Sequence, residues 1–188
     1  MGSGLTYSRP VDSAGWTVTV YYTAVEAYHT APPTRVTGCP TIDCAHGTAD
    51  LGSYPADFVQ AVRDEGTGRT KTGRYLNWSH DTGYWLDDAP RDAYGRPLRP
   101  FESAAADTDV LPSGTRFTIV HCGHDDGQPV DPTVCTRLHR AHWTITDQFT
   151  PGFGGRRHLD VYIGEETGPR FTDGPWYCTL TDATIRIG

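Results

Sequence analysis

The sequence predicts a mainly β domain, folded as a small barrel with many turns and one or two short helices. Glycine and proline together make up about 19% of the 188 residues, against an average of about 12%. This composition favours short elements and argues against a helical bundle. Short β-branched and aromatic runs recur between turn residues along the chain, which is typical of a small barrel.

The expected strands are runs rich in valine, isoleucine, threonine and aromatic residues. They cover residues 16–22, 75–78, 84–86, 115–121, 142–146, 158–163 and 178–187. A helix is expected at residues 55–64. Ser53 can cap this helix and Pro55 suits its first turn, while Phe58 and Val62 fall on one face.

We expect a single domain at residues 16–188, because no boundary is visible and the length suits one core. Within it, residues 30–100 are expected to be an insertion, with proline-containing loops at 30–52 and 87–100. Residues 1–15 are expected to form an arm whose first four residues are a cloning remnant in place of a removed signal peptide.

Four of the five cysteines are expected to form two disulfides that close loops. Cys39 and Cys44 enclose a short loop, and Cys122 and Cys135 enclose a polar segment. The fifth cysteine, Cys178, is then left over and is expected to lie buried in a strand.

Zinc binding is the alternative for these cysteines, because histidines lie close to Cys44 and Cys122. No C-x-x-C pair is present and the histidines lack zinc-finger spacing, so the disulfides are favoured. Disulfides persist in oxidising compartments, which indicates a secreted, extracellular or cell-wall-associated protein. We expect neither a metal nor an organic cofactor.

The charge balance argues against nucleic acid as a partner. The chain has 16 basic and 23 acidic side chains, a net charge of −7, and a single lysine, Lys71. A nucleic-acid surface needs clustered basic residues to neutralise phosphates. No apolar run approaches the roughly 20 residues that span a bilayer, so we expect no membrane span. We expect a monomer.

Three aspartates in distinct contexts are the most informative residues. Asp107 precedes a Pro-Ser-Gly turn that leads into a strand, and Asp147 ends the next strand. Asp160 lies inside a strand in which Leu159 and Val161 point to the opposite face. Taken alone, separated aspartates are more often turn or surface residues, because Asp favours turns for local reasons.

The order of these contexts resembles the three-aspartate (3D) domain family. That family has an Asp-Pro-x-(apolar)-(apolar)-Pro-x-Gly-Thr turn, then Asp-x-Gly-Gly, then an Ile-Asp-(apolar)-Tyr strand. The matching aspartates are Asp107, Asp147 and Asp160. Residues 20–24 and 162–177 are similar to segments of its membrane-bound lytic transglycosylase A type enzymes.

The resemblance implies a six-stranded double-psi β-barrel that cleaves β-1,4 glycosidic bonds of peptidoglycan. Asp160 would be the general acid and base: it protonates the bridging oxygen and then takes the proton of the sugar's C6 hydroxyl. Asp147 would raise the pKa of Asp160 or stabilise positive charge at the anomeric carbon. Asp107 would hold the Pro-x-Gly turn through its side chain. The residues expected to contact the glycan are Tyr22, Thr23, Tyr162 and Trp176.

The chain departs from the family pattern after Asp147, where the glycines are displaced within residues 148–155. In the family this loop borders the active cleft. Two alternatives therefore stay open. One is an inverting glycoside hydrolase that acts on another polysaccharide with Asp147 and Asp160. The other is a non-catalytic module, either an expansin-like glycan binder or a secreted inhibitor.

Overall fold

A ring of six hydrogen-bonded strands forms the larger part of the computed structural model, which describes residues 9–188. The ring runs in the order β1–β12–β7–β11–β8–β13 and closes because β13 also pairs with β1. Its strands are β1 (Val11–Val25), β7 (Ser103–Ala105), β8 (Arg116–His121), β11 (Trp143–Asp147), β12 (His158–Glu165) and β13 (Thr179–Ile187). The pairs β1–β12 and β7–β11 are parallel, and the other pairs are antiparallel.

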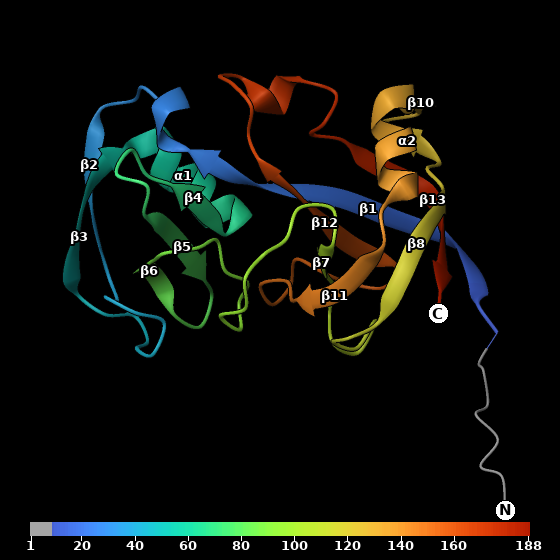
Figure 1. The fold of residues 1–188 in the computed structure, drawn as a ribbon, viewed down its shortest axis with the longest axis horizontal. Helices are drawn as coiled ribbons and strands as arrows, with labels where there is room; N and C mark the ends of the chain where they lie inside the picture. Colours follow the sequence, from blue (N-terminus) through green and yellow to red (C-terminus); the bar gives the residue numbers. More distant parts are fainter. Residues whose placement is uncertain (1–8) are drawn as a thin grey trace, which may run out of the picture.

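The longest strand, β1, runs through most of the length of the molecule (Figure 1). Every second residue from Trp16 to Ala24 is buried in the core, where Leu159 and Val161 of β12 also lie. The intervening residues of both strands face the other way. This alternation sets which side of the ring the polar side chains of β1 and β12 occupy.

A second group of elements extends the sheet from the far end of β1, on the left in Figure 1. The strands that extend the sheet are β4 (Thr67–Arg69), β5 (Tyr75–Ser79) and β6 (Gly83–Asp87). The group also contains α1 (Ala56–Glu65) and a separate two-stranded sheet, the hairpin of β2 (Pro33–Gly38) and β3 (Ala49–Pro55). Phe58 and Val62 are the buried residues of α1. A side chain at Gly68 of β4 would overlap both, so glycine permits the close approach of strand and helix.

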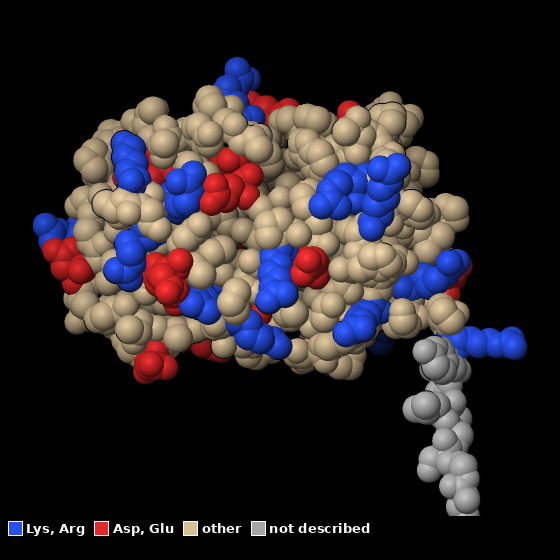
Figure 2. Space-filling model, viewed as in Figure 1, with Lys and Arg blue, Asp and Glu red and all other residues tan. Residues whose placement is uncertain are grey.

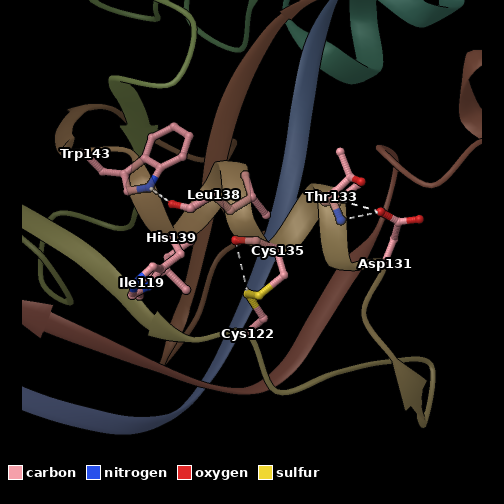
Figure 3. Close-up of a disulfide and its surroundings, with 9 residues drawn as sticks. Ile119, Cys122, Asp131, Thr133, Cys135, Leu138, His139 and Trp143 are labelled. Carbon is pink, nitrogen blue, oxygen red and sulfur yellow. Dashed lines mark hydrogen bonds between the residues drawn. A yellow bond between two sulfur atoms is a disulfide. The ribbon is translucent and has the colours of Figure 1, made fainter.

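The second helix, α2 (Pro132–Arg140), covers the end of β8. The Asp131 carboxylate accepts hydrogen bonds from the backbone N–H groups of Thr133 and Val134 at 2.9 and 3.1 Å. Proline occupies the first turn, which suits a helix start. The Cys122–Cys135 disulfide joins this helix to the chain after β8 (Figure 3). The short strands β9 (His124–Asp125) and β10 (Gln128–Pro129) lie between them.

All seven expected strands are present, and their bounds differ from the expected ones by at most three residues except at the start of β1, which lies five residues earlier. Three other predictions about these segments are wrong. Residues 30–52 contain the β2–β3 hairpin instead of a loop. Ser53 makes no capping hydrogen bond, because Pro55 takes the cap position of α1. Residues 11–15 of the expected arm belong to β1, which begins at Val11. Residues 1–8 lie outside the described part of the chain.

Both expected disulfides, Cys39–Cys44 and Cys122–Cys135, are present. The four sulfur atoms that the zinc alternative would use as ligands are bonded to each other in these disulfides. Cys178 is free and lies buried immediately before β13, and burial raises the pKa of its thiol to about 11. None of the helices at residues 9–188 has the length and hydropathy to cross a membrane.

Loss of the Cys122–Cys135 disulfide is expected to lower the free energy of unfolding by about 3 kcal/mol. The reason is the chain entropy that the bond removes from the unfolded state across a sequence separation of 13 residues. The Cys39–Cys44 pair has a separation of 5, for which the same argument gives about 2 kcal/mol. Urea unfolding of the two double serine variants measures both. An equal or larger effect of the Cys39–Cys44 pair would contradict this order.

Candidate active site

A cleft of about 790 Å³ lies between the six-strand ring and the α1–β5–β6 group. Its walls carry acidic groups from both sides, together with five tyrosine, tryptophan and phenylalanine side chains. The acidic and aromatic lining residues are Asp64, Glu65, Asp81, Asp147, Asp160, Tyr21, Trp78, Phe149, Phe153 and Tyr177. On the face drawn in Figure 2, acidic and basic side chains are interspersed and neither sign forms a continuous patch.

Asp160 enters the cleft from β12, on the strand face opposite to Leu159 and Val161. Its Oδ1 atom is buried and has no hydrogen-bond partner among the described residues. Burial raises the pKa of this carboxyl well above its usual range, and the charges of Glu65 and Asp147 add to the shift. A buried carboxylate oxygen that lacks a partner makes the charged form costly, so the proton is retained to higher pH than in water.

Asp147, at the end of β11, lines the same cleft in a different environment. Its Oδ1 accepts hydrogen bonds from the N–H groups of Ala93 and Gln148, both at 2.9 Å. Its Oδ2 accepts one from the Tyr21 hydroxyl at 3.3 Å. Burial raises the pKa of Asp147 to about 6, while the three donors favour the charged form and limit the shift. The two aspartates therefore titrate differently, and Asp147 is largely ionised at neutral pH.

Glu65 is a third cleft carboxyl, which the sequence did not indicate. It is the last residue of α1, where Gly66 ends the helix in the left-handed conformation with φ 93°. The Tyr177 hydroxyl donates a hydrogen bond to Glu65 Oε1 at 2.7 Å. Burial raises the pKa of Glu65 to about 7, with a further contribution from the charge of Asp64.

Replacement of Glu65 by Gln is expected to lower the pKa of Asp160, because the Glu65 charge disfavours ionisation of Asp160. Glutamine keeps the size of the side chain and an oxygen that can accept the Tyr177 hydrogen bond. The basic limb of the pH–rate profile should therefore move to lower pH, with the maximal rate changed much less. A Glu102→Gln variant, which makes the same change at an exposed site outside the cleft, serves as the control. An unmoved basic limb in the Glu65→Gln variant would contradict the coupling.

Asp107 does not line the cleft, and its side chain does not hold the Pro-x-Gly turn as expected. Its Oδ2 instead accepts the N–H of Gly155 at 2.8 Å. The backbone carbonyl of Asp107 accepts the N–H groups of Val110 and Leu111, which satisfies the start of the turn without the side chain. The Asp107 carboxylate thus supports the loop between β11 and β12.

The four residues expected to contact the glycan do not line the cleft. Tyr22 is buried in the core because it shares the face of Val18 and Val20, and Trp176 packs against Phe101. Thr23 and Tyr162 are buried and share a hydrogen bond of 2.5 Å.

Tyr21 lines the cleft in their place. The period-two pattern of Trp16, Val18 and Val20 was the available signal, since it places Tyr22 inward and Tyr21 on the face of Asp160.

No family model matches the chain, and no curated protein matches it in sequence. Solved structures do match. E. coli MltA with bound chitohexaose aligns with a TM-score of 0.57 over 92% of this chain and 71% of that one, at 13% identity. The membrane-bound lytic murein transglycosylase of Agrobacterium tumefaciens gives 0.57 over 95% and 75%, also at 13% identity. MltA of Neisseria gonorrhoeae gives 0.52 over 93% and 72%, at 12% identity.

The chain has the fold of the MltA lytic transglycosylases. The resemblance drawn from the three aspartates is thereby confirmed at the level of the fold. At 12–14% identity the alignment assigns no residue a role, so the chemistry rests on the cleft of this chain.

Proposed function

We propose that the protein is a secreted lytic transglycosylase that cleaves β-1,4 glycosidic bonds of peptidoglycan, with Asp160 as general acid and base. The observation that carries the proposal is the Asp160 carboxyl, which lines the cleft and whose Oδ1 atom is buried without a hydrogen-bond partner among the described residues. A carboxyl whose pKa is raised by its surroundings suits a proton donor at neutral pH. The shared fold with lytic transglycosylases supports this reaction over others that the cleft could host.

The reaction begins with the transfer of the Asp160 proton to the oxygen that bridges two sugars. The bond from the anomeric carbon to this oxygen breaks, and the leaving sugar departs as an alcohol. Positive charge then develops at the anomeric carbon, where the Asp147 carboxylate stabilises it. Asp147 is suited to that part because three hydrogen-bond donors hold it in its charged form.

The second step returns the proton. The C6 hydroxyl of the same sugar attacks the anomeric carbon and closes an anhydro ring, while the Asp160 carboxylate accepts the hydroxyl proton. Asp160 ends in its starting state, and no water is consumed. One acid–base residue therefore completes the cycle, whereas an inverting hydrolase needs a second carboxylate to activate water.

We further propose that the six-strand ring is a double-psi β-barrel. Support comes from the number of strands and from the two parallel pairs within an otherwise antiparallel ring. Two disulfides in a chain of this size support an exported location.

Digestion of purified peptidoglycan in H₂¹⁸O tests the proposed reaction. Mass spectrometry of the products should find anhydro-muramyl ends without ¹⁸O, and the Asp160→Asn variant should form them about 10³-fold more slowly. Asp109→Asn, an exposed aspartate outside the cleft, is the matched control and should behave as the wild type. Reducing ends that carry ¹⁸O would establish the hydrolase instead. Glycan binding without any product, in both wild type and Asp160→Asn, would establish a binding module.

A further inference from the structure

Phe153 has an unusual position for an apolar side chain. It is 72% exposed, the largest fraction among the large hydrophobic residues that the structure describes, and it lines the cleft that holds Asp160. No other aromatic ring of residues 9–188 pairs with it. A single exposed apolar residue is common on protein surfaces. Phe153 differs from such a residue in the way its loop is held at the cleft.

The loop that carries Phe153, residues 148–157, is held by Asp107, which does not itself line the cleft. The carboxylate of Asp107 accepts the N–H of Gly155 at 2.8 Å. A side chain at Gly154 would overlap the same carboxylate, so any other residue at this position would displace the Asp107 side chain from its contact. The N–H of Phe153 closes a turn onto the carbonyl of Thr150 at 3.0 Å.

The same loop is fixed on the cleft side by contacts to the strand of Asp160. The rings of Phe149 and His158 pack with centroids 4.6 Å apart. His158 lies two residues before Asp160 on the same strand face, and its Nε2 is 2.9 Å from the Thr19 hydroxyl. Thr19 stands opposite Asp160 in the β1–β12 pairing. The loop that carries Phe153 is therefore held by contacts at both sides, and one of these contacts is to the strand of Asp160.

We propose that the face of Phe153 is a stacking site for one pyranose ring of the bound glycan. A sugar ring has an apolar C–H face, which an aromatic ring covers in stacked contact and removes from water. The ligand of this site is therefore one residue of a β-linked polysaccharide that already occupies the cleft. The inference rests on glycan binding from the proposed function, and it does not require that the glycan be cleaved.

The site explains the parts of the loop that depart from the three-aspartate pattern. The displaced glycines 154 and 155 serve the contact with Asp107, and Phe153 reaches the cleft. Asp107 acts in this account as a positioning residue for a binding surface, with no part in proton transfer. Substitutions at Asp107 and Phe153 should consequently affect the same quantity, the affinity for the glycan.

Calorimetric titration with chitohexaose tests the proposal in the Asp160→Asn background, where turnover does not interfere. Phe153→Ala should raise the Kd about fivefold to tenfold, and Phe153→Tyr should keep it within about twofold. Asp107→Ala should raise the Kd by a similar factor and speed hydrogen exchange at the Gly155 amide. Tyr28→Ala, which removes an exposed aromatic residue outside the cleft, is the matched control and should leave the Kd unchanged.

Equal affinity of the Phe153→Ala and parent proteins would overturn the proposal, as would a comparable loss in the Tyr28→Ala control. Absence of chitohexaose binding to the parent protein would also overturn it. These outcomes are separate from the test of the proposed reaction. Anhydro products from the wild type would support the proposed reaction whether or not Phe153 contributes to affinity. A loss of affinity in Phe153→Ala would support stacking even if no bond is cleaved.

Discussion

Replacement of Asp160 by Asn is expected to lower kcat/KM on peptidoglycan by about 10³-fold, because the variant lacks the only proton donor assigned to the bridging oxygen. Asparagine has nearly the same shape, so the loss should come from chemistry with glycan affinity largely kept. Rates of anhydro-product release and the Kd for chitohexaose separate the two effects. Activity within tenfold of the wild type would contradict the assignment, and Asp109→Asn controls for the removal of a carboxylate as such.

The same variant should show an altered dependence of stability on pH. Folding raises the pKa of Asp160, so its contribution to stability is greatest below the unfolded-state pKa of about 4. That contribution is lost as the pH rises towards the folded-state pKa. The Asn variant has no such loss, so its Tm relative to the wild type should increase between pH 4 and pH 8. A constant difference over this range would indicate that the carboxyl titrates normally.

Replacement of Asp147 by Asn is expected to lower the maximal rate by about 10²-fold and to remove the acidic limb of the pH–rate profile. The wild-type rate should rise with pH through about 6, since burial raises the pKa of Asp147 to that value and only its charged form stabilises positive charge. The Asn side chain can still accept from Ala93 and Gln148, so the local structure should persist. The pH dependence of kcat/KM for the two proteins measures this. If the variant keeps an acidic limb near pH 6, that limb belongs to another group. Glu65 is then the first candidate, because burial raises its pKa to about 7.

Local patterns in the sequence predicted the parts of the structure that depend on strands. Alternating residues around Asp160 placed its carboxyl opposite to Leu159 and Val161, as found. The Asp107, Asp147 and Asp160 contexts identified the fold that structural comparison confirms. Each of these signals is contained in a few consecutive residues, so it can be recognised without knowledge of the fold.

The parts that were missed depend on contacts between distant segments or on weak local signals. Glu65 meets Tyr177 across 112 positions, and its ordinary place at the end of α1 carries no mark of a site. Helix α2 was missed because the segment between Cys122 and Cys135 was interpreted as a polar loop. Its Asp131 cap, with proline at the helix start, was the available local signal.

The three carboxyls discussed above come from the two opposite walls of the cleft. Asp147 and Asp160 come from neighbouring parts of the ring, and Glu65 comes from the opposite wall of the cleft. The position of the scissile bond relative to these three carboxyls therefore decides which of them can donate the proton.

A crystal structure of the Asp160→Asn variant with chitohexaose measures that position most directly. We expect a hexamer that runs through the cleft, with one bridging oxygen about 2.6–3.2 Å from the side chain of residue 160. The Asp147 carboxylate should then face the anomeric carbon of the same linkage. A hexamer bound outside the cleft, or a bridging oxygen within reach of Asp147 or Glu65 and away from residue 160, would contradict the central role of Asp160.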